Sequence, residues 1–370
     1  MLAGEMSGDN LGAGLIQSLR EHQPNLQVEG IGGPAMIAQG LNSMASIDEL
    51  AMMGYVEPLL HLPKLLALRK RIYQHFVEQP PDIFIGIDYA YFNNSLELRL
   101  KKRGIRTAHY VSPQLWASRP RRIHKLKQSV DLMLCLFPFE VDIYKQHNMQ
   151  AVFIGHPLAD KIPLEIDSEA ARRELGLPTE QPLVALLPGS RGNEIKYLLP
   201  HFIAAAKQCL QVKPELHFIL PAANQKRYQQ IQTELSRHDL PITLFNGQSL
   251  QVMQAADVVL MASGTTTLEA MLLKKPMVVS YQVSRLNYAI MSRMLTSDYI
   301  ALPNVLAGQQ LVPEIIQEAV NGTALAHAVM HYFNDPDQAH GLREKFSRLH
   351  QQLRQNASAT AARAILNTAS

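Results

Sequence analysis

The residue pattern with the clearest chemistry is a glycine turn in the second half of the chain. Residues 183–187 are apolar and predict a buried strand, and Pro188-Gly189-Ser190-Arg191 follows before a helical pattern begins. The first N–H groups of a helix lack intrahelical partners, and the helix dipole adds partial positive charge, so this turn suits a phosphate. Arg191 adds a permanently charged guanidinium that matches phosphate oxygens. We therefore predict phosphate binding by Gly189, Ser190 and Arg191.

A second turn of the same kind follows the strand-like residues 257–261. Its residues Ser263, Gly264 and Thr265 precede another helical pattern, and Glu269 lies one turn into that helix. Two such turns in one half of the chain suggest a site for a nucleotide diphosphate, with Glu269 on the ribose hydroxyls. The alternative is that each is an ordinary strand-to-helix turn, where glycine provides backbone freedom and the helix dipole favours a glutamate.

Polar residues also end the predicted strands of the first half. Asp88 follows the apolar residues 83–87 and can accept a proton from a sugar hydroxyl, although an aspartate here can also cap the next helix. Ser112 and His156 follow two further strands, and we expect His156 to form a wall of the site. Asn304, in the predicted loop 302–308, is a weaker candidate for contact with phosphate or base.

Strand and helix patterns alternate along the whole chain, which predicts parallel sheets built from βαβ units. The polar segment 161–167 separates two such series. We therefore expect an α/β protein of two doubly wound, Rossmann-like domains facing across a cleft, an arrangement called GT-B, with ligands beyond the carboxyl ends of the strands. The predicted boundaries are residues 1–165, joined by a returning C-terminal helix at about 345–370, and residues 166–344. The predicted strands are 27–31, 81–87, 107–111, 132–136 and 152–154, then 184–187, 217–220, 242–245, 258–261 and 277–281.

The N-terminus departs from this pattern. Only Met1-Leu2-Ala3 precedes the strand-to-helix turn 4–9, which carries Glu5 and Ser7. An α/β domain normally has about five strand residues before its first turn. The first strand is therefore either truncated or unusually short.

Composition excludes several classes of protein. The 370 residues are 47% apolar with a net charge of +3, which is typical of a soluble two-domain protein and argues against a nucleic-acid partner. Cys135 and Cys209 are too few for a disulfide scaffold, and no metal-ligand cluster is visible, so we expect no metal, no cofactor and a reducing cytoplasm. No secretory signal or membrane-spanning segment is found.

Residues 47–76 combine crowded apolar side chains with the bases Lys64, Arg69, Lys70 and Arg71, and contain Pro58 and Pro63. This pattern fits a surface that lies on anionic lipid or grips acyl chains. The alternative is a pair of core helices with a solvated basic end. A second basic run, residues 119–127, follows Trp116; it is either a solvated helix face or a site for a phosphorylated acceptor.

Many of these motifs occur together, in this order, in one family. The chain closely resembles the lipid-A-disaccharide synthases, which are inverting glycosyltransferases of lipopolysaccharide biosynthesis. The matching motifs are Gly4-Glu5 with Ser7-Gly8-Asp9, Gly32-Gly33-Pro34, Met53-Gly54, Gly86-Ile87-Asp88, His109 to Pro113, Gly155-His156, Pro188 to Gly192, Ala262 to Thr265 with Glu269, and Leu302 to Gly308.

The resemblance implies that a diacylglucosamine unit is transferred from UDP-2,3-diacylglucosamine to the 6-hydroxyl of 2,3-diacylglucosamine 1-phosphate. It implies that Asp88 is the general base, that Arg191 and the two turns stabilise the departing diphosphate, and that Glu269 and Asn304 contact the nucleotide. Glu5, Ser7, Ser112 and His156 then line the acceptor side. We expect peripheral association with the inner membrane through residues 47–76, and a homodimer remains open.

Four departures from the family pattern, besides the short first strand, bear on substrate affinity. Tyr91 stands in place of a second aspartate, Ser118 in place of an aromatic residue, and Gln309-Gln310 in place of an Arg-Glu pair. Two other hypotheses stay open. One is a UDP-sugar epimerase on the same scaffold, against which residues 47–76 argue. The other is a diverged paralogue that binds UDP or lipid with low activity.

Overall fold

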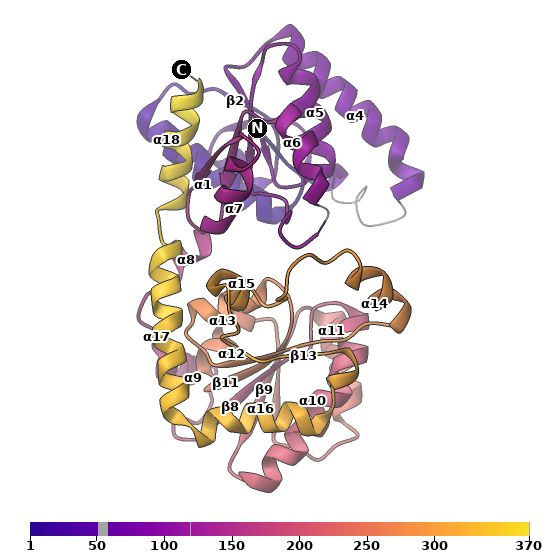
Figure 1. The fold of residues 1–370 in the computed structure, drawn as a ribbon, viewed down its shortest axis with the longest axis vertical. Coiled ribbons are helices and arrows are strands. Elements are labelled where there is room, and N and C mark those ends of the chain that lie inside the picture. Colours follow the sequence, from indigo (N-terminus) through magenta and orange to yellow (C-terminus); the bar gives the residue numbers. More distant parts are fainter. Residues whose placement is uncertain (51–57, 119, 370) are drawn as a thin grey trace. The chain divides into compact units, whose positions relative to one another are not determined.

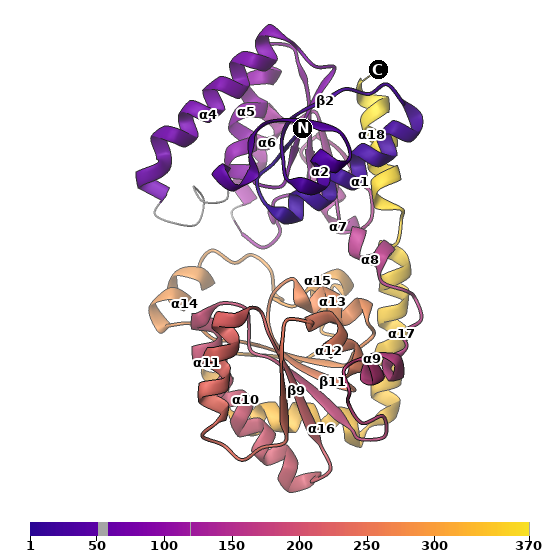
Figure 2. The ribbon, with the colours of Figure 1, turned by 180° about the vertical axis from the view of Figure 1, so that it is seen from behind.

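The computed structural model describes residues 1–50, 58–118 and 120–369. The chain divides into two compact units (Figures 1 and 2). The first contains residues 1–160 and 353–370, and the second contains residues 161–352. The sequence had placed these boundaries at 165 and 345. Met53-Gly54 and Arg119, singled out above, lie outside the described residues.

The first unit is built on a seven-stranded parallel sheet with the order β3-β2-β1-β4-β5-β6-β7. Its helices cover both faces: α1, α2 and α18 on one, and α4, α5 and α6 on the other (Figures 1 and 2). The strands are β1 (Leu2–Ala3), β2 (Val28–Gly32), β3 (Leu41–Ser46), β4 (Ile83–Ile87), β5 (Arg106–Tyr110), β6 (Leu132–Cys135) and β7 (Gln150–Phe153). The helices are α1 (Met6–His22), α2 (Pro34–Ala38), α4 (Pro58–Glu78), α5 (Ala90–Lys101), the 3₁₀ turn Pro120–Arg122, α6 (Ile123–Ser129), α7 (Pro138–Lys145), α8 (Pro157–Lys161, ending just past the boundary) and α18 (Ala357–Ala369).

The short first strand lies in the middle of this sheet. Leu2 pairs with Ile31 of β2 and with Gly86 of β4, and Ala3 pairs with Ile87. Leu2 and Ala3 are fully buried, and the amino group of Met1 donates a hydrogen bond to the Glu29 carbonyl at 2.6 Å. Two residues therefore join the β2–β3 edge of the sheet to the β4–β7 half.

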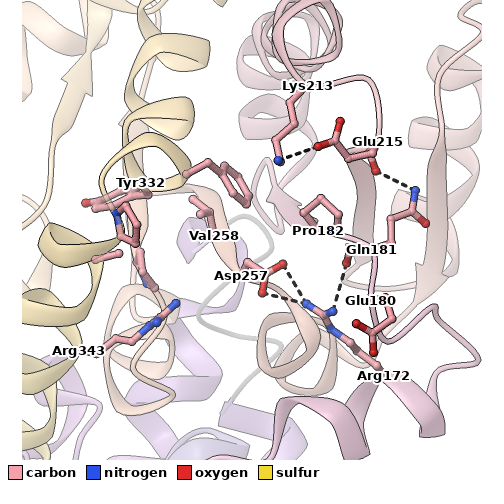
Figure 3. Close-up of a pocket in the computed structure, with 14 residues that line it drawn as sticks. Arg172, Glu180, Gln181, Pro182, Lys213, Glu215, Asp257, Val258, Tyr332 and Arg343 are labelled. Atoms are coloured by element: carbon pink, nitrogen blue, oxygen red, sulfur yellow. Dashed lines mark hydrogen bonds and ion pairs between the residues drawn. The ribbon is translucent and has the colours of Figure 1, made fainter.

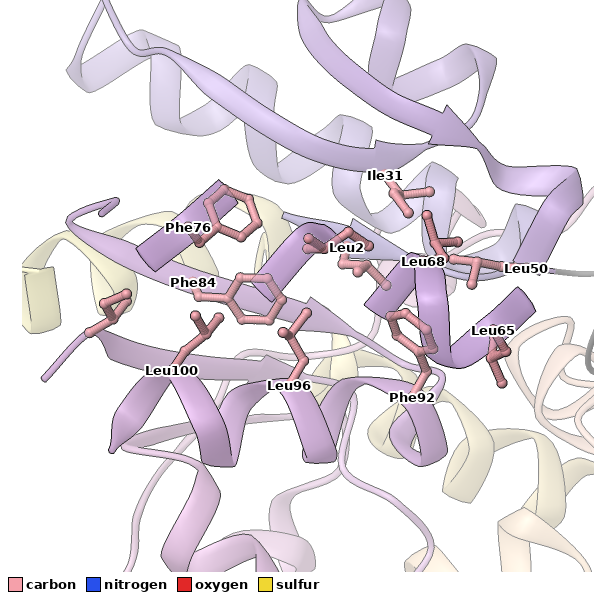
Figure 4. Packing of buried hydrophobic residues seen from close by; sticks show 12 residues of the cluster. Leu2, Ile31, Leu50, Leu65, Leu68, Phe76, Phe84, Phe92, Leu96 and Leu100 are labelled. Atoms are coloured by element: carbon pink, nitrogen blue, oxygen red, sulfur yellow. The ribbon is translucent and has the colours of Figure 1, made fainter. Parts of the chain in front are cut away.

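The core of the first unit favours the second interpretation of residues 47–76, in which apolar side chains of this segment pack inside the protein. Leu65, Leu68, Ile72 and Phe76 follow helical spacing along α4 and are buried against the sheet (Figure 4). They pack with side chains of β1, β2, β4 and α5, among them Leu2, Ile31, Phe84, Phe92 and Leu96. The helix continues through Pro63 rather than breaking there. Most of the described apolar side chains of α4 therefore belong to the hydrophobic core.

The second unit repeats the architecture with a six-stranded parallel sheet in the order β10-β9-β8-β11-β12-β13. Helices α10, α11 and α16 cover one face, and α9, α12 and α13 the other. The strands are β8 (Leu183–Leu187), β9 (His217–Ala222), β10 (Ile242–Asn246), β11 (Val258–Ala262), β12 (Met277–Tyr281) and β13 (Glu314–Ile316). The helices are α9 (Ser168–Glu174), α10 (Gly192–Val212), α11 (Gln225–Leu235), α12 (Ser249–Ala255), α13 (Thr266–Leu272), α14 (Arg285–Ser292), α15 (Leu302–Ala307), the 3₁₀ turn Gln317–Ala319, α16 (Gly322–Asn334) and α17 (Pro336–Leu353).

The C-terminal segment forms two helices, α17 in the second unit and α18 in the first. Helix α18 packs against α1, and Gly14 allows the close approach because a Cβ there would lie 2.6 Å from Ser358 Oγ. The Asp160 carboxylate accepts hydrogen bonds from the N–H groups of Asn356 and Ala357 at the start of α18. Capping by Asp160 thus anchors the returning helix.

A buried carboxylate near the N-terminus makes a matching contact. Asp9 of α1 is 0% exposed and accepts hydrogen bonds from Gly33, Ala35 and Met36 N–H groups at 2.8–2.9 Å. Those N–H groups begin α2, where no residue of that helix supplies a side-chain cap. Asp9 therefore caps α2 from a neighbouring helix.

We predict that Asp9→Ala destabilises the first unit by about 3 kcal/mol, because three buried N–H groups lose a charged acceptor. Thermal or urea unfolding of the purified protein measures this loss. The exposed Glu21→Ala in the same helix is the control and is expected to change stability by less than about 0.5 kcal/mol. Equal stability of the two variants would contradict the capping role.

Candidate active site

The first unit brings its predicted residues to the carboxyl edge of its sheet. Glu5, Asp88 and Ser112 follow β1, β4 and β5, which are neighbours in the sheet. Asp88 is exposed. Its Oδ1 accepts a hydrogen bond from the next N–H group, that of Tyr89, at 2.8 Å, and it does not cap α5. The carboxylate is thus accessible to an acceptor hydroxyl.

The backbone around Asp88 is strained. Asp88 and Tyr89 have φ values of 50° and 45°, and Val111, at the end of the adjacent strand, has φ 80°. A left-handed conformation costs a residue with a side chain about 1–2 kcal/mol. Such strain persists only where the surroundings enforce it, and it concentrates at functional sites. The carboxylate therefore stands on a backbone conformation that the fold imposes.

Ser112 and His156 are integrated into the fold. Ser112 is buried, and its hydroxyl lies 2.7 Å from the Tyr144 hydroxyl, so the expectation that it lines the acceptor side is not supported. His156 stacks on Phe137, and its Nδ1 accepts a hydrogen bond from the Leu158 N–H group. Burial lowers the pKa of His156 to about 4, so the ring is neutral at physiological pH. A neutral, packed ring fits a wall and not a base.

Exposed apolar side chains lie on the first turns of the helices at this edge. Met6 of α1 is 55% exposed and Tyr91 of α5 is 71% exposed, while Ser7 is also exposed. Tyr91 lies three residues after Asp88, so an exposed aromatic side chain follows the carboxylate closely in the sequence. This edge presents apolar surface beside the proposed base.

In the second unit, the Gly189 turn already holds a carboxylate. Gly189 has φ 117°, and the N–H groups of Ser190 and Arg191 both donate to Glu194 Oε2, at 2.9 and 3.1 Å. The Arg191 guanidinium is 81% exposed and lies 3.2 Å from Glu194 Oε1. We expected these N–H groups to be free. Instead the turn binds an anion supplied by its own helix, α10, which shows that its geometry suits one.

The second turn is more open. The hydroxyl of Ser263 donates to the Ile300 carbonyl at 2.9 Å, and a Cβ added at Gly264 would meet no atom within 4 Å. Helix α13 begins at Thr266, as the sequence indicated. Burial raises the pKa of Glu269, which is partly buried on the first turn of this helix. Gly264 and Thr265 are exposed and accessible to a ligand.

Asn304 does not take the role that we expected. It is 0% exposed and lies in α15, where the sequence predicted a loop. Its Nδ2 donates to the Val312 carbonyl and to Glu314 Oε1, and its Oδ1 accepts from two backbone N–H groups, those of Leu311 and Val312. The side chain is fully used in holding the segment before β13, so we assign it no contact with a nucleotide.

A well-defined hollow of the second unit lies elsewhere. Its volume is about 570 Å³, and it opens at the amino ends of β8, β11 and β12 in the second unit (Figure 3). Two ion pairs line this hollow: Arg172 with Asp257 at 2.9 Å, and Lys213 with Glu215 at 2.7 Å. Ligands of doubly wound sheets bind at the carboxyl ends of the strands, whereas this hollow lies at their amino ends. We therefore do not place the active site in this hollow.

Comparison with known proteins decides the family. The family model described as lipid-A-disaccharide synthetase matches residues 1–365. The lipid-A-disaccharide synthase of Cellvibrio japonicus is 49% identical over 366 residues, covering 99% of this chain and 95% of the relative. That of Pseudomonas aeruginosa strain UCBPP-PA14 is 48% identical over 367 residues, covering 99% and 96%. The chain belongs to the lipid-A-disaccharide synthase family. It is therefore a glycosyltransferase, as its motifs indicated.

Solved structures confirm the fold class. Acinetobacter baumannii MurG matches with a TM-score of 0.58 at 15% identity, covering 98% of this chain and 97% of that one. A UDP-GlcNAc 2-epimerase from Neisseria meningitidis, bound to UDP-GlcNAc, matches with a TM-score of 0.62 at 12% identity, covering 96% of each chain. At these identities the likeness shows two doubly wound α/β units of the GT-B class and nothing finer.

The basic run after Trp116 has a simple explanation within the described residues. In α6, Ile123 and Leu126 face the core, while Lys125 and Lys127 are exposed, as are Arg121 and Arg122 before it. This agrees with the solvated helix face, and no observation among the described residues points to a bound acceptor there.

We predict that Glu194→Ala strengthens binding of UDP several-fold, because a phosphate then no longer competes with a tethered carboxylate for the two N–H groups. The same change is expected to lower stability by about 1 kcal/mol through loss of the helix cap. Isothermal titration with UDP and thermal unfolding measure the two effects. Weaker UDP binding in a variant of intact fold would show that Glu194 helps the ligand instead.

Proposed function

We propose that the protein transfers 2,3-diacylglucosamine from UDP-2,3-diacylglucosamine to the 6-hydroxyl of 2,3-diacylglucosamine 1-phosphate, with inversion and release of UDP. Sequence identity of 47–49% to proteins named lipid-A-disaccharide synthase, over 99% of the chain, supports this reaction. The epimerase alternative is not favoured, because the epimerases share only the fold at 12% identity.

Asp88 is the general base in this proposal. An inverting transfer needs one group that removes the proton of the attacking hydroxyl. Asp88 is the exposed carboxylate at the end of β4, held on a strained backbone at the carboxyl edge of the first unit's sheet. The exposed Met6 and Tyr91 nearby along this edge suit an acceptor that carries acyl chains.

The second unit supplies the donor side. The Gly189-Ser190-Arg191 turn offers N–H groups and an exposed guanidinium to the departing diphosphate, in exchange for Glu194. The exposed Gly264-Thr265 turn and Glu269 are the nucleotide-binding candidates on the adjacent strand β11. Stabilising the leaving group in this way complements the base, since bond formation and bond breaking are coupled in a displacement.

Peripheral attachment to an anionic membrane, the cytoplasmic face of the inner membrane, completes the proposal. No helix among the described residues is long and apolar enough to cross a bilayer. Lys64, Lys70 and Arg71 are exposed on α4, and Leu66 between them is 44% exposed, whereas the core-facing residues of the same helix are buried. The outer face of α4 thus combines positive charge with apolar surface.

We predict that Asp88→Ala lowers kcat for UDP release by about 10²–10⁴-fold, the contribution of a positioned base. The assay uses the UDP-diacylglucosamine donor with the monosaccharide 1-phosphate acceptor. Asp82→Asn, an exposed aspartate just before the same strand, is the matched control and is expected to keep wild-type turnover. Near-normal turnover by Asp88→Ala would refute the assigned role.

We predict that the protein co-sediments with phosphatidylglycerol-containing vesicles and that added salt weakens this binding. Lys64→Glu with Lys70→Glu is expected to weaken it at least about fivefold, because each basic residue near such a surface contributes about 1 kcal/mol. Lys125→Glu with Lys127→Glu, on α6, is the control with the same change in charge. Equal loss in both pairs, or binding insensitive to salt, would contradict a specific role for α4.

A further inference from the structure

A fully buried polar cluster lies beneath the Asp88 turn. Asn93 and Glu97 of α5 and His109 of β5 are each 0% exposed. The Nδ1 atom of His109 lies 2.6 Å from Glu97 Oε1, which makes a buried ion pair when the ring is protonated. Within the described part of the chain, His109 Nε2 and Glu97 Oε2 have no hydrogen-bond partner.

The cluster is connected to Asp88 through α5. Asn93 and Glu97 are four residues apart and so lie on the same face of the helix. The Nδ2 group of Asn93 donates to the Asp88 carbonyl at 2.8 Å, with longer contacts to the carbonyls of Ile87 and Leu2. The position of α5 over the sheet therefore sets where the Asp88 backbone is held.

A glycine makes room for this arrangement. A Cβ at Gly86, in the strand that leads to Asp88, would lie 2.2 Å from Glu97 Oε1 and 3.0 Å from Asn93 Cβ. Gly86 is also paired with His109 across the β4–β5 ladder. The glutamate thus reaches the histidine across the backbone of β4, which no larger residue at this position would permit.

The charges of Glu97 and Asp88 both act on the His109 ring. Burial by itself lowers the pKa of His109, but the charge and hydrogen bond of Glu97, with a contribution from the charge of Asp88, outweigh burial and raise it. The His109 ring is thus influenced by two carboxylates, a buried one on Glu97 and an exposed one on Asp88. Among the described residues, these two are the only groups whose charge raises its pKa.

Stability alone does not account for such a pair. Replacing a buried ion pair by apolar residues of similar volume is often neutral or stabilising, and two of the polar atoms here lack partners. A catalytic group, in contrast, must be held closely in position, since a misplacement of about 1 Å can cost about 10²-fold in rate. The strained backbone at Asp88, Tyr89 and Val111 needs a rigid support of this kind.

We propose that the buried Glu97–His109 pair is a positioning pair for Asp88: it fixes α5, and with it Asn93, beneath the base. Neither residue contacts substrate. This inference rests on the proposed role of Asp88 as general base.

The first experiment separates positioning from simple stabilisation. Glu97→Gln is expected to lower kcat by about tenfold to hundredfold while both KM values stay within about twofold. The control is Asp131→Asn, which breaks the 2.7 Å contact to Lys101 near the other end of α5 and is expected to lose stability without loss of kcat. Equal kcat in wild type and a folded Glu97→Gln would overturn the proposal.

A second variant guards against failure to fold. Glu97→Met with His109→Leu removes both ionisable side chains together, so neither is left buried without the other, and the variant is expected to fold and still to lose kcat. Full kcat in this double variant would show that the pair is only structural. In an Asp88→Ala background, the same double change is expected to reduce the residual rate no further, because the pair acts through Asp88. A further drop of the same size would overturn that link.

The same assays distinguish the two proposals. A wild-type protein without UDP release, or an Asp88→Ala variant with normal kcat, would defeat the proposed function itself. A wild-type protein that turns over and depends on Asp88, together with an unaffected pair variant, would defeat only the positioning role.

Discussion

The first unit depends on the backbone hydrogen bonds of two residues. Leu2 and Ala3 are the whole of β1, and they lie between β2 and β4 in the middle of the sheet. A parallel sheet needs every central strand to be paired on both sides, because a buried N–H or carbonyl group without a partner costs free energy. The sequence compensates with full burial of both side chains and with the bond from the Met1 amino group to Glu29. The same two residues set the positions of the Glu5 turn and of β4, which leads to Asp88.

Strain and support occur together at the end of β4. Two consecutive left-handed residues would not persist in an isolated turn. Asn93 holds the Asp88 carbonyl, and the Asp88 N–H group donates to the Tyr110 carbonyl at 2.8 Å. The proposed base is exposed while its own backbone N–H and carbonyl groups are both hydrogen-bonded, which combines access for an alcohol with a defined position.

Sequence reasoning predicted the alternating architecture because apolar runs ending at glycine or polar residues are a local signal, and all ten expected strands exist. It missed β3 and β13, since Leu41–Ser46 mixes polar residues into the strand and Glu314–Ile316 is very short. It also missed the α15 helix, where Pro303 and Gly308 suggested a loop but Pro303 lies in the first turn and Gly308 ends the helix. Strand β13 has only three residues, which are too few to show a periodic pattern.

For the site, sequence patterns identified residues at strand ends but not their partners. Asn304 and Ser112 were reasonable candidates by residue type. However, the Asn304 side chain is hydrogen-bonded to the Val312 carbonyl, and the Ser112 hydroxyl to that of Tyr144. Conversely, Asp9 and His109 belong to motifs of the family resemblance, but the sequence did not indicate their roles, and Glu97 was not singled out at all. Only the packing of helices on the sheet brings these three residues to their partners. A residue's chemistry can be read from the chain, whereas its hydrogen-bond partners depend on tertiary contacts.

The carboxylate in the Gly189 turn has a consequence for selectivity. A tethered group competes at a high effective concentration, so a small free anion gains little by displacing it. In the proposed reaction, a diphosphate attached to a nucleoside and a sugar has further contacts with which to offset that cost. The tethered carboxylate would then make the turn selective for the donor over small inorganic anions.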